Sequence, residues 1–242
     1  MPPRLYLDQA LRAGDALDLP PGASRHAQVL RMQPGDALTL FNGEGGEWSA
    51  GVERMGASVV QVRVGEHLAV ERELPFAVML ALGMPANERM DALVEKATEL
   101  GVAAIQPLLC ERSVLRLSGE RAVKRVEHWR GVAIAASEQS GRTRVPQVAP
   151  VRTLVDWLRS LAPSDPSARF VLSLRDAPPL DSRACRESNV FLSGPEGGLS
   201  EAEEAGVRAA GFAPLSLGPR VLRADTAPLA ILAALGLGSG SV

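Results

Sequence analysis

Phe191-Leu-Ser-Gly-Pro-Glu-Gly-Gly198 is a glycine-rich segment that connects two regular elements of the chain. The apolar run Asn189–Leu192 is predicted to be a short buried strand. After the segment, Ser200-Glu-Ala-Glu203 has the spacing of a capping box, in which the two side chains accept hydrogen bonds from each other's backbone amides at a helix start. That helix is expected to end at Gly211. The segment is therefore predicted to be a loop between a strand and a helix, the repeating unit of a parallel α/β sheet.

A second loop of this kind, Leu217-Gly-Pro-Arg-Val-Leu-Arg223, follows the predicted strand Pro214–Leu217 and precedes an Ala/Leu-rich helix, Thr226–Leu237. In open α/β sheets, ligands bind beyond the carboxyl ends of the strands, where both loops are expected to lie. Glycine allows the main chain to approach a flat ligand closely. One such loop is more often a tight turn, but two in consecutive units favour a binding site.

The alternation of strands and helices begins at Phe76. Strands are predicted at 76–82, 103–109 and 170–174, and helices at 87–100, 119–140 and 155–161. Asn87 is expected to cap the first of these helices, and Gly101 to end it. Strands that alternate with helices predict a mostly parallel sheet with helices on both faces.

The sequence before Glu71–Pro75 has a different character. Short β-rich runs at 36–41, 47–52 and 58–64 are separated by turns that contain Gly and Asn, and one or two helical turns are expected at 25–31. These runs predict a small barrel or sandwich. We therefore predict two domains, a β-rich domain over residues 1–72 and an α/β domain over residues 73–242.

Composition excludes several classes of protein. Apolar residues make up 46% of the 242 residues, which predicts a globular fold. No stretch approaches about 20 consecutive apolar residues, so we expect a cytoplasmic protein with no membrane partner. The two cysteines match no metal or redox spacing and are expected to be free thiols. No metal is expected, because the three histidines are scattered and the chain has no HExxH motif.

Positive charge is concentrated in the middle of the chain. Residues 111–146 carry eight Arg and Lys against four Glu, a net charge of +4. Residues 1–74 carry seven Arg against ten Asp and Glu, a net charge of −3. A basic run of this kind is typical either of a solvated helix face or of a surface that contacts phosphates, and charge alone leaves both interpretations open.

The two glycine-containing loops also carry a resemblance. SGPEGGLS, which begins at Ser193, and LGPRVLRADTAPLA, which begins at Leu217, resemble the C-terminal signature of the ribosomal small-subunit (16S) RNA uridine-N3 methyltransferases. This family belongs to the SPOUT superfamily of knotted α/β methyltransferases. Further matches lie at 26–31, 96–101 and 135–142, the last followed by Val145-Pro146. Five motifs in the same order cover nearly the whole chain, so the resemblance is specific.

The resemblance implies a fold and a function. Residues 1–72 are expected to form a PUA-like β-barrel that binds RNA, and residues 73–242 an α/β trefoil-knot domain with a parallel sheet. The implied activity is methylation of N3 of one uridine, with S-adenosylmethionine as cofactor and with 16S ribosomal RNA or the small ribosomal subunit as substrate. A homodimer is also implied, and the final helix supports it because a helix that is apolar nearly all round must be buried.

The family's functional residues are transferred through the matching motifs. The residues expected to bind the cofactor are Leu172, Ser193, Gly194, Pro195, Glu196, Gly197, Gly198, Leu217, Gly218, Val221 and Leu222. Those expected near the reacting base, as catalytic residues, are Arg223, Glu138 and Arg142. Those expected to bind RNA are Arg25, His26, Arg31, Arg112 and Arg116.

Two of these residues have alternative interpretations. Glu196 is expected either to bind the cofactor's ribose or methionine part, or to interact with the N-terminus of the helix that follows it. Arg223 is expected either to stabilise an anionic uracil or fix a phosphate, or to pair with Asp225 at the helix end. Asp225 stands where the family pattern has Glu, so it is not proposed as a base.

Three other functions are compatible with the sequence. A related knotted enzyme would methylate the ribose 2′-hydroxyl instead of the base. A non-catalytic ribosome assembly factor would keep the fold but would not bind the cofactor, whereas the intact glycines of both loops favour binding. An enzyme for small molecules would need a phosphate-binding motif that the chain lacks, and would leave the basic segment unexplained.

Overall fold

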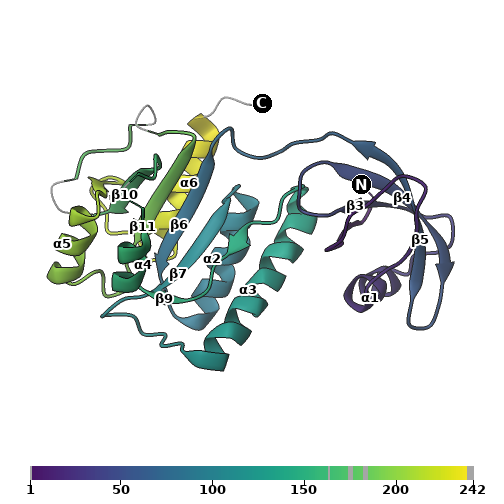
Figure 1. The fold of residues 1–242 in the computed structure, drawn as a ribbon, viewed down its shortest axis with the longest axis horizontal. Coiled ribbons are helices and arrows are strands. Elements are labelled where there is room, and N and C mark those ends of the chain that lie inside the picture. Colours follow the sequence, from purple (N-terminus) through teal and green to yellow (C-terminus); the bar gives the residue numbers. More distant parts are fainter. Residues whose placement is uncertain (1, 163, 174–176, 182–184, 239–242) are drawn as a thin grey trace. The chain divides into compact units, whose positions relative to one another are not determined.

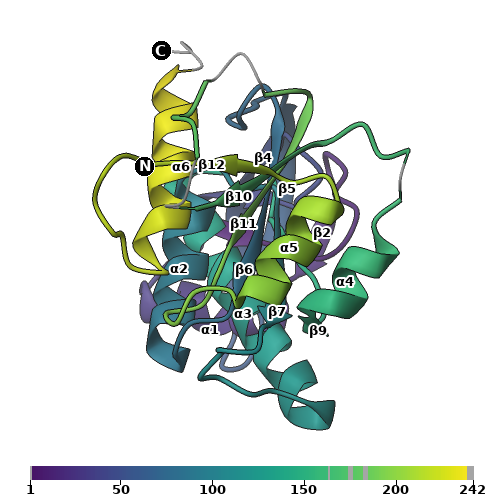
Figure 2. The same cartoon turned by 90° about the vertical axis from the view of Figure 1, so that its left-hand side faces the viewer.

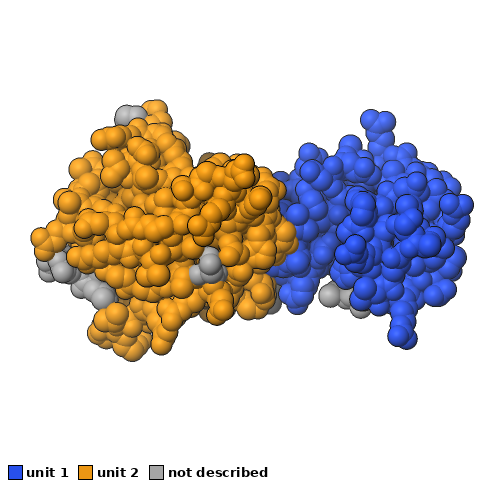
Figure 3. Space-filling view, turned by 90° about the horizontal axis from the view of Figure 1, so that it is seen from below, with its two compact units in different colours: residues 1–73, 134–145 blue, residues 74–133, 146–242 orange. Residues whose placement is uncertain are grey.

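The chain folds into two compact units (Figures 1 and 3). The computed structural model describes residues 2–162, 164–173, 177–181 and 185–238. The first unit contains the chain up to Glu73 together with Ile134–Val145, and the second contains 74–133 and 146–242. The sequence boundary at 73–74 lies beside the predicted domain boundary, but the assignment of 134–145 to the first unit was not predicted.

The first unit is built on a five-stranded sheet with the order β1-β3-β4-β5-β2. Its elements are β1 (Arg4–Tyr6), β2 (Ala16–Asp18), α1 (Pro21–Val29), β3 (Ala37–Phe41), β4 (Glu47–Met55) and β5 (Val60–Leu68). In β5, Val60, Val62 and Val64 are buried while Arg63 between them is exposed, as expected for a strand with one face on a core. The prediction of a β-rich N-terminal domain is confirmed.

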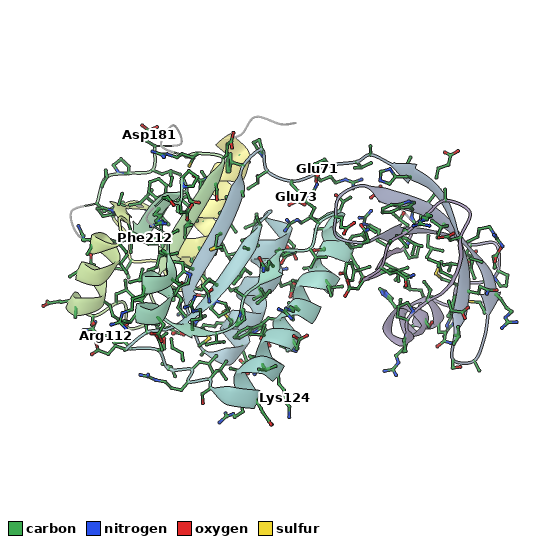
Figure 4. The ribbon with its side chains drawn as sticks, in the orientation of Figure 1. Glu71, Glu73, Arg112, Lys124, Asp181 and Phe212 are labelled. Atoms are coloured by element: carbon green, nitrogen blue, oxygen red, sulfur yellow. The ribbon has the colours of Figure 1, made fainter. Side chains whose placement is uncertain are left out.

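Residues 134–145 are attached by ion pairs to the segment that follows β5. Arg142 pairs with Glu73, and its Nε donates to the Glu73 carboxylate at 2.9 Å. Arg144 pairs with Glu71 at 2.9 Å. Figure 4 labels Glu71 and Glu73, which follow one another closely on the segment after β5. The side chain of Arg142 is 4% exposed, so this guanidinium is held in a buried ion pair.

The second unit contains a seven-stranded sheet in which every recorded strand pairing is parallel. The strand order is β12-β10-β11-β6-β7-β8, and β9 pairs with β7. The strands are β6 (Ala77–Gly83), β7 (Ala104–Leu109), β8 (Gln147–Val148), β9 (Arg152–Thr153), β10 (Ala168–Leu172), β11 (Ser188–Ser193) and β12 (Ala213–Leu215). Neighbouring strands that are far apart in the chain, such as β6 and β11, show that this sheet is assembled by crossovers.

Helices cover both faces of the second sheet, as predicted (Figure 2). They are α2 (Asn87–Glu99), α3 (Gly119–Ser140), α4 (Leu154–Ser160), α5 (Glu201–Ala209) and α6 (Thr226–Gly238). α4 and α5 lie on one face, and α2 and α6 lie on the other. The part of α3 in this unit buries Val126 and Trp129, and the Trp129 indole donates to Asp91 of α2 at 2.8 Å. None of the helices that the structure describes is long and apolar enough to cross a membrane.

Two local predictions about helix starts have different outcomes. The capping box of α5 is confirmed: Ser200 Oγ accepts from the Glu203 amide at 3.3 Å, and Glu203 Oε2 accepts from the Ser200 amide at 3.0 Å. The predicted cap of α2 is wrong, because Ala86 is the N-cap residue and Asn87 is already helical. The backbone amide of Ala86 instead donates to Glu196, which is distant in sequence and satisfies this donor in place of a local cap.

Several strand limits also differ from the predictions. β10 ends at Leu172 and β12 at Leu215, earlier than the predicted ends, and residue 174 lies outside the described residues. Four strands of two or three residues, β1, β2, β8 and β9, were not predicted. Strands this short contain too few residues to show an alternating pattern, so the sequence carries no period that would reveal them.

Candidate functional site

A cavity of about 550 Å³ lies in the second unit, where three neighbouring strands end. It is bounded by the last residues of β10, β11 and β12 and by the loops that follow β11 and β12. The lining residues are Arg89, Arg112, Val171, Leu172, Ser173, Ser193, Gly194, Pro195, Glu196, Gly197, Gly198, Leu199, Glu204, Leu215, Leu217, Arg220, Val221, Leu222, Arg223, Ala224 and Ala227. Because the carboxyl ends of parallel strands meet at one edge, the two glycine-containing loops come together there.

This cavity gathers nearly all the residues that were predicted to bind a cofactor. Ten of those eleven residues line it, and Gly218 is the exception. Gly218 instead allows the loop to turn, since its φ of +98° lies in the left-handed region that favours glycine. The prediction that the two loops form one site therefore has a geometric basis, while the binding role of each residue stays a prediction.

The loop after β11 folds closely on itself. A Cβ atom on Gly194 would lie 3.1 Å from the Leu199 amide nitrogen, and Gly198 has a φ of +69°. The Gly198 amide donates to the Pro195 carbonyl at 2.8 Å, which closes the turn. A side chain at Gly194 would crowd the loop and one at Gly198 would be strained, so glycine at these positions leaves the main chain open to the cavity.

Glu196 lies at a helix N-terminus, but not at that of the helix which follows it. Its Oε1 accepts from the Ala86 amide at 3.0 Å and lies 3.5 Å from Arg89 Nη1, both at the start of α2. A carboxylate is favourable there because it satisfies an unpaired amide and faces the positive end of the helix dipole. The expectation that Glu196 interacts with the following helix, α5, is thereby corrected to α2, which lies beside the loop because β6 pairs with β11.

Arg112, labelled in Figure 4, lies in the segment that follows β7 and contacts the same loop. Its Nη1 donates to the carbonyl of Gly197 at 3.0 Å and is 3.4 Å from the carbonyl of Leu199. Arg112 was predicted to bind RNA, and its position in the cavity wall was not expected. Arg116, which was predicted for the same role, is exposed and donates to the carbonyl of Glu111 in its own segment.

Arg223 has an exposed side chain in the cavity wall and a backbone that starts α6. Its carbonyl accepts from the amides of Thr226 and Ala227, each at 3.0 Å. The alternative of a helix-end ion pair is not observed: no ion pair joins Arg223 to Asp225, both of which the structure describes. Arg223 therefore lines the cavity without an ion pair to Asp225, and its action on a substrate stays a prediction.

The other two predicted catalytic residues, Glu138 and Arg142, belong to the first unit and do not line this cavity. Burial raises the pKa of Glu138, and a hydrogen bond from the Tyr6 amide at 2.9 Å and the nearby charges of His26 and Arg4 oppose that shift. The guanidinium of Arg142 forms an ion pair with Glu73. Their catalytic roles stay predictions.

The remaining predicted RNA-binding residues lie on and just after α1 of the first unit. Arg25, His26 and Arg31 are all exposed. His26 Nδ1 lies 3.9 Å from a carboxylate oxygen of Glu138. Arg31 has a φ of +55°, the one positive value among the non-glycine residues that the structure describes.

Sequence reasoning missed several lining residues. Val171, Ser173, Leu199 and Arg220 adjoin the motifs that were recognised, so an extension of those motifs by one or two positions would have included them. Arg89 and Glu204 come from helices α2 and α5, and no local signal marks them. In the described part of the chain, no group of three or more His, Cys, Asp or Glu residues could hold a metal ion.

Comparison with known families assigns both parts of the chain. Residues 72–236 match the model of an RNA methyltransferase domain, and residues 19–65 match the model of an RNA methyltransferase PUA domain. Among curated proteins, the chain is similar to ribosomal RNA small subunit methyltransferase E of Synechocystis, with 35% identity over 85% of this chain and 67% of the relative. The Bacillus subtilis protein of the same name is 33% identical over 86% of this chain and 84% of its own length.

Solved structures show the same similarity over nearly the whole chain. Ribosomal RNA small subunit methyltransferase E from Neisseria gonorrhoeae, bound to S-adenosylmethionine, is 36% identical with a TM-score of 0.91, and 98% of each chain is covered. A methyltransferase from Legionella pneumophila in complex with S-adenosylmethionine is 34% identical with the same TM-score and coverage. The predicted fold class, a SPOUT α/β-knot domain preceded by a PUA-like domain, is confirmed.

Proposed function

Because the chain belongs to the RNA methyltransferase family that contains the ribosomal RNA small subunit methyltransferases E, we propose that it methylates N3 of one uridine in 16S ribosomal RNA, with S-adenosylmethionine as methyl donor. The observation that carries this proposal is the cavity formed by the two glycine-containing loops at the carboxyl ends of β10, β11 and β12. The relatives' names and the cofactor in two similar structures support it.

The cavity has the properties that S-adenosylmethionine requires. Its volume of about 550 Å³ is in the range of pockets for small molecules and cofactors. Apolar side chains such as Leu172, Leu217 and Leu222 suit a flat adenine ring, and the glycine-rich turn exposes backbone amides and carbonyls for polar groups. When bound, the cofactor would supply an electrophilic methyl group on a sulfonium centre.

Arg223 is proposed to act on the substrate. Uracil N3 carries a weakly acidic proton that must pass to solvent water or another base as the nitrogen takes the methyl group and the methyl–sulfur bond of the cofactor breaks, so the base gains negative charge as it reacts. A guanidinium on a residue of the cavity wall would stabilise that charge without a large rearrangement. Arg220, in the same loop and also in the cavity wall, is proposed to contact an adjacent phosphate of the RNA.

The rest of the chain is proposed to hold the RNA and a second subunit. Arg25, His26 and Arg31 form an exposed basic group on the PUA-like unit, which suits phosphate contacts from a hairpin of the substrate. Helix α6 is apolar nearly all round, and Leu237 near its end is 88% exposed in the single chain. Coverage of this helix by a second copy would remove that apolar surface from water, which supports the proposal of a homodimer.

The direct test is methyl transfer from labelled S-adenosylmethionine to small ribosomal subunits that lack the modification, followed by nucleoside mass spectrometry. We expect 3-methyluridine with the wild-type protein. The Arg223→Ala variant should lose about 100-fold in rate while its affinity for the cofactor stays within a few fold, because it removes a group that acts on the developing charge. Arg130→Ala is the matched control, since Arg130 is exposed on α3 and pairs with Glu127 of the same helix.

Each other outcome has a defined meaning. Label on a ribose would contradict the proposed position of methylation and support 2′-O transfer. Cofactor binding without any transfer to subunits or free RNA would contradict an enzymatic function and support an assembly factor.

A further inference from the structure

The loop between β11 and α5, residues 194–199, is held mainly from outside itself. Its internal support that the structure describes is the turn from the Gly198 amide to the Pro195 carbonyl. Two charged side chains link it to other parts of the sequence, Glu196 reaching out to α2 and Arg112 reaching in from the segment after β7. We call residues 194–199 the glycine loop.

Arg112 contacts the glycine loop at two carbonyls. Its Nη1 donates to the carbonyl of Gly197 at 3.0 Å and approaches that of Leu199 at 3.4 Å, so one nitrogen is shared by two carbonyls of the same turn. The two residues also fit together by shape: a Cβ atom on Gly197 would lie 3.0 Å from Arg112 Cβ. The absence of a side chain at Gly197 is what allows the arginine to lie against the loop.

The segment that carries Arg112 is itself fixed to the other end of the loop. The amide of Glu111 donates to Glu203 Oε1 at 2.7 Å, while the second carboxylate oxygen of Glu203 closes the capping box with Ser200. A single carboxylate therefore ties the start of α5 to the residue before Arg112. The backbone that carries Arg112 is therefore already fixed. Holding its side chain against the glycine loop then costs less conformational entropy.

We propose that Arg112 is a positioning residue, which orders the glycine loop for the cofactor and does not act mainly as a contact for RNA. The inference rests on the proposed function, because the glycine loop is the proposed cofactor-binding element. An arginine is suited to this task since its planar guanidinium holds Nη1 in a fixed direction between the two carbonyls, whereas lysine carries a compact charge on a flexible stem.

The two roles predict different measurements. If Arg112 orders the loop, Arg112→Ala should weaken S-adenosylmethionine binding about tenfold, the effect of one hydrogen bond from a charged donor, and should leave RNA affinity within about twofold. At saturating cofactor, kcat should return close to the wild-type value. Arg112→Lys should recover part of the cofactor affinity, because the ammonium can still donate to the loop carbonyls but is held less rigidly than the guanidinium.

The experiment measures cofactor affinity by calorimetry, RNA affinity at several salt concentrations, and hydrogen–deuterium exchange of the peptide that contains the glycine loop. Exchange should become faster in Arg112→Ala even without ligand, since the loop loses an external support. Arg130→Ala is the matched control for cofactor affinity and for exchange, because Arg130 is exposed on α3 and its described ion pair goes to Glu127 of the same helix.

Two results would overturn the inference. One is unchanged cofactor affinity in Arg112→Ala together with weaker RNA binding and a shallower salt dependence, which would make Arg112 a phosphate contact. The other is unchanged exchange of the loop peptide. If the wild-type protein fails to bind S-adenosylmethionine, the proposed function fails, but exchange in the free protein still decides whether Arg112 orders the loop.

Discussion

Arg112 and Gly197 are separated by 85 positions in the sequence, yet the guanidinium of one donates to the carbonyl of the other at 3.0 Å. The contact depends on the missing side chain at Gly197, where a Cβ atom would lie 3.0 Å from Arg112 Cβ and 3.4 Å from its Cδ. Residue size at one position therefore controls how closely the other can support the loop.

Gly197→Ala should weaken S-adenosylmethionine binding by several fold, because the added methyl group displaces Arg112 or the loop. The thermal shift that the cofactor produces should shrink accordingly. Gly206→Ala is the matched control: it lies on α5 with nothing within 4 Å of an added Cβ atom, so cofactor binding should not change. Equal cofactor shifts for both variants would contradict a tight fit at Gly197.

Gly83→Ala should destabilise the second unit by roughly 1–3 kcal/mol. An added Cβ atom at the end of β6 would lie 2.6 Å from the backbone nitrogen of Pro195, which cannot move aside as a flexible side chain would. Urea denaturation measures the loss. Gly131→Ala is the opposite case, because it lies in α3 with nothing within 4 Å and should gain about 0.5–1 kcal/mol from helix propensity. A stable Gly83→Ala variant would show that the strand end and the loop are less closely packed than described.

Arg31→Gly should change stability and RNA affinity in opposite directions. A non-glycine residue at a φ of +55° is strained, so glycine there should stabilise the first unit by up to about 1 kcal/mol. Loss of the charge should weaken RNA binding and lower the slope of its salt dependence by about one. Arg25→Ala should share the effect on RNA without the gain in stability. Unchanged RNA binding in both variants would exclude this surface as a phosphate contact.

Glu47→Gln should destabilise the first unit at neutral pH by roughly 3 kcal/mol, since it leaves Arg4 without its buried partner. Burial alone would raise the pKa of Glu47, but hydrogen bonds from Arg72 and Arg4 outweigh it and hold the pKa below the ordinary value of 4.5. The ion pairs of Glu47 therefore contribute their full stabilisation at a pH above 4.5. That contribution to the free energy of unfolding is lost as the pH falls through the lowered pKa.

The difference in unfolding free energy between Glu47→Gln and wild type should accordingly shrink as denaturation is repeated at increasingly acid pH. Glu44→Gln, a nearby substitution on the turn before β4, should stay within about 0.5 kcal/mol of wild type at neutral pH. A difference for Glu47→Gln that does not depend on pH would show that packing, and not charge, accounts for the loss.

The features that sequence analysis predicted well are those whose chemistry is local. The capping box at Ser200 needs only a residue three positions away, and it forms as expected. The limits of α3 match the predicted 119–140. The predicted cap at Asn87 was wrong because the chemistry at this helix start is not local. The acceptor for the Ala86 amide is Glu196, which lies 110 positions away in the sequence.

The two glycine-containing loops, and their place at the ends of strands, could be inferred from the sequence because glycine spacing and strand-to-helix order are local properties. The contacts of Arg112 and Glu196 that hold the first of these loops could not be inferred from the sequence. Glu196 reaches α2 because β11 lies beside β6 in the folded sheet. Arg112 reaches the loop because β7, which precedes it, lies beside β6. The strand order depends on how the apolar faces of all the strands and helices of the domain are buried together. A short sequence motif contains no information on this long-range free energy, so it cannot predict the order.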